Sequence, residues 1–126
     1  MCIRDRFRLE ALERRLQDPD ADATNVLAAL RHALEVRSAQ PALHPDAAMT
    51  VLSSDRSDLV ILKRSIDGDN ALYAVHNITS NRLTLSLAQL RAESDSGFVD
   101  CLSGQSFAAQ QQPSIEPYAV HWLVKS

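Results

Sequence analysis

The sequence predicts a mainly β protein, with an antiparallel β-sandwich or sheet at its C-terminal end and two α-helices before it. Apolar residues recur at helical spacing only before Pro41, whereas short runs rich in β-branched and aromatic residues follow Pro45. Because helices and strands do not alternate, the chain cannot build a parallel α/β domain by itself. Its 126 residues leave room for one ordinary domain.

The two helices are predicted over residues 7–16 and 23–38. Pro19 disfavours helical backbone at Asp18, so the first helix ends there. Each helix carries an apolar stripe at spacings of three and four residues, made of Leu9, Leu12 and Leu16 in the first and of Val26, Leu27, Leu30, Ala33 and Leu34 in the second. Neither stripe has an evident partner in the chain, which indicates that the surface they cover lies in an upstream segment.

Six short strands are predicted after the helices, separated by polar turns. They fall in residues 50–54, 58–66, 71–79, 82–90, 97–102 and 117–125. The segment "IDGDNA" suits a hairpin connection in which Gly68 takes a positive φ. Strand alternation places Leu83, Leu85 and Leu87 on one face, and the polar stretch 108–113 is predicted to be a loop.

Composition excludes several classes of function. A net charge of −3 does not favour a nucleic-acid partner, and we interpret the basic run at the N-terminal end as a solvated helix face, comprising Arg4, Arg6, Arg8, Arg14 and Arg15. No apolar run approaches the ~20 residues of a membrane span, and the charged opening cannot be a signal peptide. Cys2 and Cys101 lack disulfide-scaffold spacing, so we expect a reduced, cytoplasmic protein.

The polar residues predict structure more than chemistry. The imidazoles do not have metal-ligand spacing, so we favour packing or hydrogen bonding at a domain junction over a metal site for His32, His44, His76 and His121. The group Asp67, Asp69 and Asn70 lacks the spacing of a calcium loop and predicts a polar turn instead. The formal sequon Asn77-Ile78-Thr79 is interpreted as structural.

Three further polar residues are also assigned to local structure. Ser103 lacks a nucleophile-elbow context, so we expect it in a turn. Asp46 and Asp100 are expected in turn or cap roles rather than in catalysis.

Tyr118 and Trp122 are the aromatic pair of the last predicted strand. Strand alternation would place both on one face. An exposed pair could stack on sugar rings, whereas a buried pair would belong to the core. We favour the core, because the chain has few large side chains to fill a sandwich.

Several short motifs occur in a fixed order along nearly the whole chain, from about residue 7. Those of the helical part are carried by Leu9, Leu12, Leu16, Asp18, Pro19, Leu30, Arg31, Pro41, Ala42, Leu43, His44 and Pro45. Those of the β part are carried by Arg64, Ser65, Gly68, His76, Asn77, Thr79, Asp100, Leu102, Gly104, Pro117, Tyr118, Trp122 and Leu123. Together they resemble the junction of catalytic barrel and C-terminal β-domain in sucrose phosphorylase-like enzymes of glycoside hydrolase family 13, the α-amylase family.

The resemblance implies that residues 7–43 are the helical end of a (β/α)₈ barrel and that residues 44–126 are a C-terminal all-β domain. Such enzymes transfer an α-glucosyl unit from sucrose, or from a similar glucoside, to phosphate with retention. No stretch matches their catalytic strands, so we assign no catalytic, metal or cofactor-binding residue. The expected role is to stabilise the missing catalytic barrel of the same polypeptide; the alternative is a free-standing β-sandwich that binds a carbohydrate or a protein.

The first six residues, "MCIRDR", resemble adapter-derived sequence at the start of truncated reading frames. We therefore expect residues 1–6 to be a non-native leader and Met1 not to be the true start.

Overall fold

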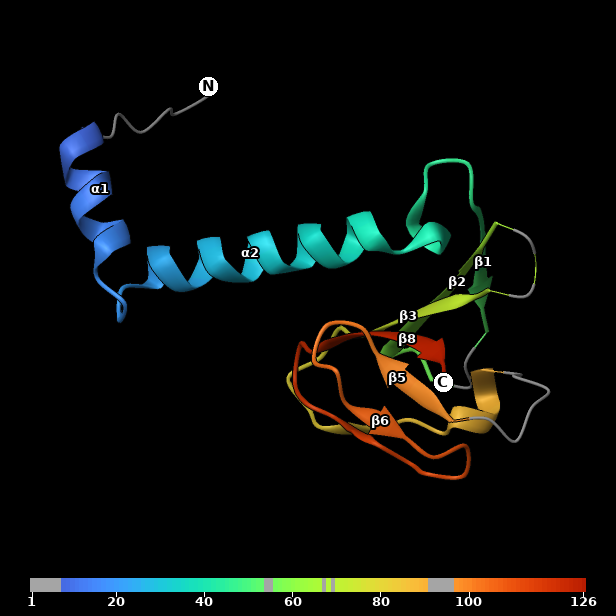
Figure 1. Cartoon of the computed structure of the whole chain (residues 1–126). Coiled ribbons are helices and arrows are strands. Elements are labelled where there is room, and N and C mark those ends of the chain that lie inside the picture. Colours follow the sequence, from blue (N-terminus) through green and yellow to red (C-terminus); the bar gives the residue numbers. More distant parts are fainter. Residues whose placement is uncertain (1–7, 54–55, 67, 69, 91–96) are drawn as a thin grey trace, which may run out of the picture. The chain divides into compact units, whose positions relative to one another are not determined.

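The computed structural model describes residues 8–53, 56–66, 68, 70–90 and 97–126, with only the backbone described at Gln89 (Figure 1). The expected leader, residues 1–6, lies outside the described residues. The chain divides into two compact units, residues 1–35 and residues 36–126.

The first unit contains helix α1, Leu9–Gln17, and most of helix α2, Asp22–Ala39. Both predicted helices are confirmed to within two residues. The backbone at Asp18 is extended (φ −83°, ψ 113°), as a residue before proline requires. Asp18 also accepts a hydrogen bond from the Asp20 N–H at 3.0 Å, which forms the turn between the helices. Neither described helix is both long and apolar enough to cross a bilayer.

The second unit is built on a six-stranded antiparallel sheet in the order β1-β2-β3-β8-β5-β6. Its strands are β1 Ala48–Leu52, β2 Leu59–Ser65, β3 Leu72–Asn77, β8 Val120–Lys125, β5 Phe98–Asp100 and β6 Ser106–Phe107. A second sheet pairs β4, Leu83–Thr84, with β7, Ser114–Ile115. The predicted class, two helices followed by an antiparallel β domain, is therefore confirmed.

Two details differ from the sequence-based expectation. The predicted strand 82–90 is a strand only at β4 and then forms the 3₁₀-helix η2, Leu87–Leu90. Strands β6 and β7 were not predicted, because strands of two residues carry no detectable periodicity.

The main core fills the space between one face of the large sheet and the β4–β7 and η2 segments. Tyr73 and Phe98 meet edge to face at its centre, with ring centroids 5.8 Å apart. Leu83, Leu85 and Leu87 are all buried in this core, as the alternation predicted, although Leu87 reaches it from η2.

The opposite face of the sheet carries a smaller cluster. Leu72 and Ala74 of β3 pack there with Ala42 of the 3₁₀-helix η1, Pro41–Leu43. The side chain of Arg64, in β2, donates hydrogen bonds to the carbonyl oxygens of His44, at 2.9 Å, and Ala47, at 3.3 Å. These bonds fix the turn at residues 44–47 to β2, and so hold the chain where helical structure gives way to strands.

Candidate functional site

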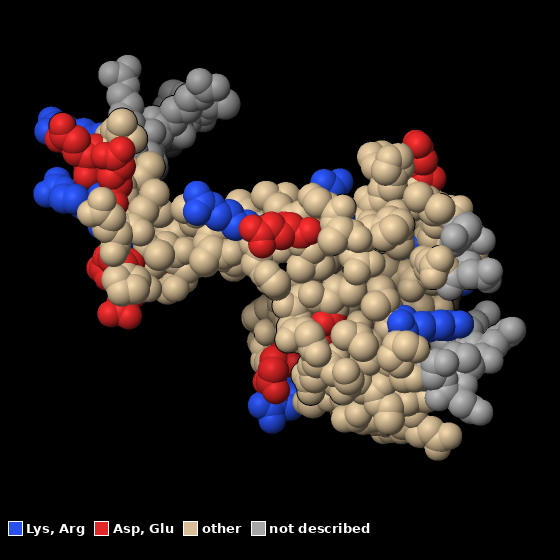
Figure 2. Space-filling model, viewed as in Figure 1, with Lys and Arg blue, Asp and Glu red and all other residues tan. Residues whose placement is uncertain are grey.

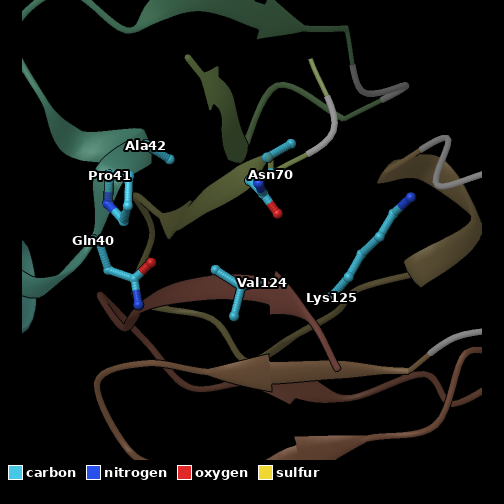
Figure 3. A pocket seen from close by; sticks show the side chains of 7 residues that line it. Gln40, Pro41, Ala42, Asn70, Val124 and Lys125 are labelled. Atoms are coloured by element: carbon cyan, nitrogen blue, oxygen red, sulfur yellow. The ribbon is translucent and has the colours of Figure 1, made fainter. Parts of the chain in front are cut away.

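A pocket in the second unit, lined by residues from η1 and from the β2–β3 and β8 segments, has a volume of about 280 Å³. Figure 3 shows Gln40, Pro41 and Ala42 on one side of this pocket, with Asn70, Val124 and Lys125 facing them; Ala71 completes the lining. Lys125 is the only titratable group among these lining residues. Glycoside bond cleavage with retention requires two carboxyl groups about 5 Å apart, so this pocket does not have the groups for that reaction.

A buried polar cluster is centred on Asp100, at the end of β5. Its side chain is only 1% exposed. One carboxylate oxygen, Oδ2, accepts the Ser103 hydroxyl at 2.7 Å and lies 3.0 Å from Nδ1 of His121. The other, Oδ1, accepts the backbone N–H groups of Trp122 at 2.9 Å and Leu102 at 3.2 Å. Asp100 therefore ties the turn after β5 to the neighbouring strand β8.

These contacts determine the ionisation of Asp100. Burial alone would raise the pKa of the carboxyl group, but the hydrogen bonds from His121, Ser103, Trp122 and Leu102 outweigh it and lower the pKa to about 2. The carboxylate is thus charged across the ordinary pH range and acts as an acceptor, not as a proton donor.

The residue types of this cluster match a catalytic triad, but their connections do not. In a triad the serine hydroxyl contacts the imidazole, and the aspartate contacts only the far side of that ring. Here the Ser103 hydroxyl donates to Asp100 itself. The geometry is that of a capped turn, in which the Gly104 N–H also donates to the Asp100 carbonyl oxygen at 2.7 Å. The turn role expected of Asp100 and Ser103 is confirmed.

Asn77, at the end of β3, is a second polar anchor and is only 3% exposed. Its amide nitrogen donates to the carbonyl oxygens of Asn81 at 2.7 Å and Glu116 at 2.8 Å. Its amide oxygen accepts both the N–H and the hydroxyl of Thr79, each at 2.9 Å. With its nitrogen buried and occupied, Asn77 cannot accept a glycan in the folded state, which supports the structural interpretation of the sequon.

The histidines do not converge on one site. His44 lies in the turn before β1, where Nδ1 accepts the Asp46 N–H at 3.3 Å and lies 3.6 Å from the Asp46 carboxylate. His76 lies on β3, where burial lowers its pKa. His32 is exposed on α2. Within the described ranges, no three His, Cys, Asp or Glu side chains gather as metal ligands would.

The "IDGDNA" segment connects β2 and β3, which pair antiparallel, and Gly68 has the predicted positive φ, +88°. The Gly68 N–H donates to the Ser65 hydroxyl at 2.7 Å. Asp67 and Asp69 lie outside the described residues.

The predicted pairing of Tyr118 and Trp122 on one strand face is wrong, and so is the core position favoured for Tyr118. Tyr118 lies in the turn before β8 with a φ of +56° and is 67% exposed. Trp122 is half-buried on β8 and packs against Leu72 and Ala74 in the smaller cluster. Pro117 and the tight turn interrupt the strand pattern that the alternation assumed.

Charged side chains do not gather into a binding patch on the visible face. Figure 2 shows Lys and Arg either apart from one another or beside Asp and Glu. Arg56 forms an ion pair with Asp58 at 2.8 Å, and Arg82 forms one with Glu116 at 2.9 Å.

Two anchors of the fold were missed by sequence reasoning. Arg64 and Asn77 were noted only as parts of motifs, and their hydrogen bonds reach residues 17 and 39 positions away along the chain. Arg64 follows Lys63 at the polar end of β2 and Asn77 ends β3, so no signal in the sequence pointed to their distant partners.

The chain has a relative among known enzymes. It is 31% identical over 121 residues to a glucosylglycerate phosphorylase of Allomeiothermus silvanus, and this match covers 96% of the chain but 19% of the relative. The matched part is the C-terminal fifth of that phosphorylase. No protein-family model matches the chain.

Solved structures share the fold. AmyP in complex with maltose is 24% identical, with a TM-score of 0.58, over 72% of this chain and 18% of AmyP. The F164L mutant of MutB, from crystals soaked with trehalulose, is 18% identical, with a TM-score of 0.60, over 90% of this chain and 19% of MutB. A GH27 β-L-arabinopyranosidase from Geobacillus stearothermophilus is 17% identical, with a TM-score of 0.52, over 67% of this chain and 21% of that enzyme.

The last of these likenesses comes from a different glycosidase family, so this β fold by itself does not specify an activity. The sequence match is more specific, since it extends over the helices and the β domain in one continuous alignment. The chain spans about a fifth of the length of each of these proteins. The chain is therefore homologous to the C-terminal region of a glucoside phosphorylase of glycoside hydrolase family 13.

Proposed function

We propose that the chain serves as the non-catalytic C-terminal part of a cytoplasmic glucoside phosphorylase. In this proposal the complete enzyme transfers an α-glucosyl unit, with retention, from glucosylglycerate, sucrose or a similar glucoside to inorganic phosphate. The chain's own task is to stabilise the upstream catalytic barrel. The observation that carries the proposal is the 31% identity to a glucosylglycerate phosphorylase over 96% of the chain.

The surface of the helices supports this role. Neither α1 nor α2 contains a buried residue, and Val26, Leu30 and Leu34 are each at least half exposed along α2. Burying apolar surface releases about 25 cal/mol per Å², so a helix that exposes such a stripe is stabilised when another part of the polypeptide covers it. An upstream barrel would supply that cover.

The polar groups support a structural rather than a chemical role. Asp100 and Asn77, the buried polar side chains of the described core, use their hydrogen-bonding groups within the fold. Neither is available to a substrate. The two carboxyl groups that a retaining mechanism needs would therefore come from the barrel.

A replacement experiment tests the proposal. The A. silvanus phosphorylase would be expressed with its matched C-terminal region exchanged for residues 8–126 of this chain, beside the same enzyme lacking that region. We expect the chimera to fold and to release glucose 1-phosphate from glucosylglycerate and phosphate, and the shortened enzyme to aggregate or lose activity. A chimera no better than the shortened enzyme would contradict the proposal.

A further inference from the structure

The turn before β8 presents a small apolar surface, the Tyr118 patch, made of Ile78, Tyr118 and Val120. Their side chains are 55%, 67% and 39% exposed, respectively. The backbone brings them together, because Val120 is the register partner of His76 and the Tyr118 N–H donates to the Thr79 carbonyl oxygen at 3.1 Å. The patch therefore joins the end of β3 to the start of β8.

The conformation of Tyr118 is unfavourable for the isolated chain. Its φ of +56° lies in the left-handed region, which a bulky side chain with a Cβ rarely adopts. At the same time the ring remains two-thirds exposed, so burial within this chain does not offset the strain. Strained backbone persists where the surroundings hold it and is concentrated at functional contacts.

The surroundings of the patch hold it rigidly. Asn77, which precedes Ile78 in the chain, fixes the adjoining loops through its bonds to Thr79, Asn81 and Glu116. Two ion pairs, Arg56–Asp58 and Arg82–Glu116, are close to it along the backbone, since the Asp58 carbonyl oxygen accepts the Ile78 N–H and Glu116 precedes Pro117. An apolar centre with a charged rim, held in place before binding, is the usual anatomy of a protein interface.

We infer that the Tyr118 patch is a docking surface for the upstream catalytic part of the same polypeptide, with Tyr118 as its anchor. This inference rests on the proposed function. The occupant follows from the homology: in the phosphorylase that the chain matches, the corresponding region makes up 19% of the polypeptide, and the remaining four-fifths precede it. That preceding segment is the covalently attached surface available to cover the patch.

The test compares variants in the isolated chain and in the chimera with the A. silvanus phosphorylase. Asparagine tolerates a left-handed backbone better than tyrosine, so Tyr118→Asn is expected to raise the Tm of the isolated chain by about 4 °C. In the chimera the same substitution is expected to shorten the half-life of activity on heating about tenfold, because it removes the anchor.

Two isoleucines provide a matched control. Ile66 is 52% exposed, nearly as much as Ile78, but follows β2 at the opposite end of the β2–β3 ladder. Ile78→Ala is expected to shorten the half-life of the chimera, and Ile66→Ala to leave it unchanged. Equal effects of the two, or a Tyr118→Asn chimera as durable as its parent, would overturn the inference while the proposed function stands. A parent chimera without activity would overturn both.

Discussion

At the scale of single residues, two buried polar side chains organise the loops of the β domain. Asp100 joins the turn after β5 to β8, and Asn77 joins the end of β3 to the loops around residues 79–81 and 115–119. Each side chain supplies hydrogen-bond partners for backbone groups of irregular segments, which do not pair with one another as they would in a sheet. Their substitution should affect folding more than any exposed polar change.

Asp100→Asn is expected to destabilise the chain by about 2–3 kcal/mol. An amide has one acceptor oxygen where the carboxylate has two, so part of the set formed by Ser103, His121, Trp122 and Leu102 loses its acceptor. Urea unfolding followed by circular dichroism measures the change. Asp46→Asn is the control, since the Asp46 side chain is 89% exposed, and it should shift stability by under about 0.5 kcal/mol. Equal losses in the two variants would refute the structural role of Asp100.

The same carboxylate predicts a pH dependence. Its folded-state pKa of about 2 lies below the ordinary value of 3.8. Asp100 therefore stabilises the fold above about pH 4, by about 2 kcal/mol, and this stabilisation is lost as the pH falls toward 2. Unfolding free energies measured between pH 6 and pH 2 should fall more steeply for the wild type than for Asp100→Asn. Parallel curves would show that another group controls acid unfolding.

Asn77→Ala is expected to cost about 2–4 kcal/mol, because it leaves the Thr79 N–H and the carbonyl oxygens of Asn81 and Glu116 without their partner. Thermal unfolding should show a Tm lower by about 10 °C. Asn81→Ala is the matched control: the Asn81 side chain is exposed, and the bond from Asn77 is to its backbone carbonyl oxygen, which the substitution keeps. A Tm for Asn77→Ala as high as that of the control would show that the Asn77 hydrogen bonds do not stabilise the loops.

At the scale of elements, the turns show which glycines the fold requires. Gly68 needs its positive φ but has open space where a Cβ would lie. At Gly97, before β5, the limit is space instead of backbone conformation. A Cβ there would overlap the carbonyl oxygen of Phe107 on the paired strand β6. Substitution at Gly68 therefore tests the cost of a left-handed backbone, and substitution at Gly97 tests the cost of a steric overlap.

Gly68→Ala is expected to cost about 1–2 kcal/mol, the penalty of a left-handed alanine. Gly97→Ala should cost more, because the obstructing atom belongs to the backbone and β5 and β6 must separate to admit the methyl group. Chemical denaturation of both variants tests whether Gly97→Ala loses more stability than Gly68→Ala. A smaller loss for Gly97→Ala would show that the edge of the sheet is free to move.

Elements with enough residues to show a period were predictable, and the others were not. The 18 residues of α2 and the 6 of β3 are long enough for apolar spacing in the first and a run of strand-forming residues in the second to indicate the element. Strands β6 and β7, with 2 residues each, depend on their partners rather than on local sequence. Tyr118 was placed wrongly for a related reason: the alternation of a strand cannot reveal that a turn begins the segment.

The polar sites were less predictable than the core. The turn roles of Asp100 and Ser103 followed from local sequence, because the bonds that form the turn, from Leu102 and Ser103 to Asp100, span two and three residues. The hydrogen bonds of the Asn77 and Arg64 side chains join segments that only the folded sheet brings together. Hydrogen bonds of this kind have no signature in a single sequence.

At the scale of the whole molecule, the two units should differ in stability. Helices without a buried face are marginal in water, whereas β3 and β8 pair at the centre of the sheet over the main core. Hydrogen exchange of the 126-residue chain should show rapid exchange over residues 9–30 and strong protection in β3 and β8. Equal protection of helices and sheet would mean that the helices are stable without a further partner.

The central claim is that this chain functions as the C-terminal part of a larger phosphorylase. The most direct measurement is to sequence the source DNA upstream of the codon for Phe7. We expect an open reading frame that continues upstream and encodes a β/α barrel, of a length comparable to the four-fifths of the phosphorylase that precede the matched region. An in-frame stop codon followed by a genuine start at Met1 would contradict it, and would leave an independent β domain with two helices.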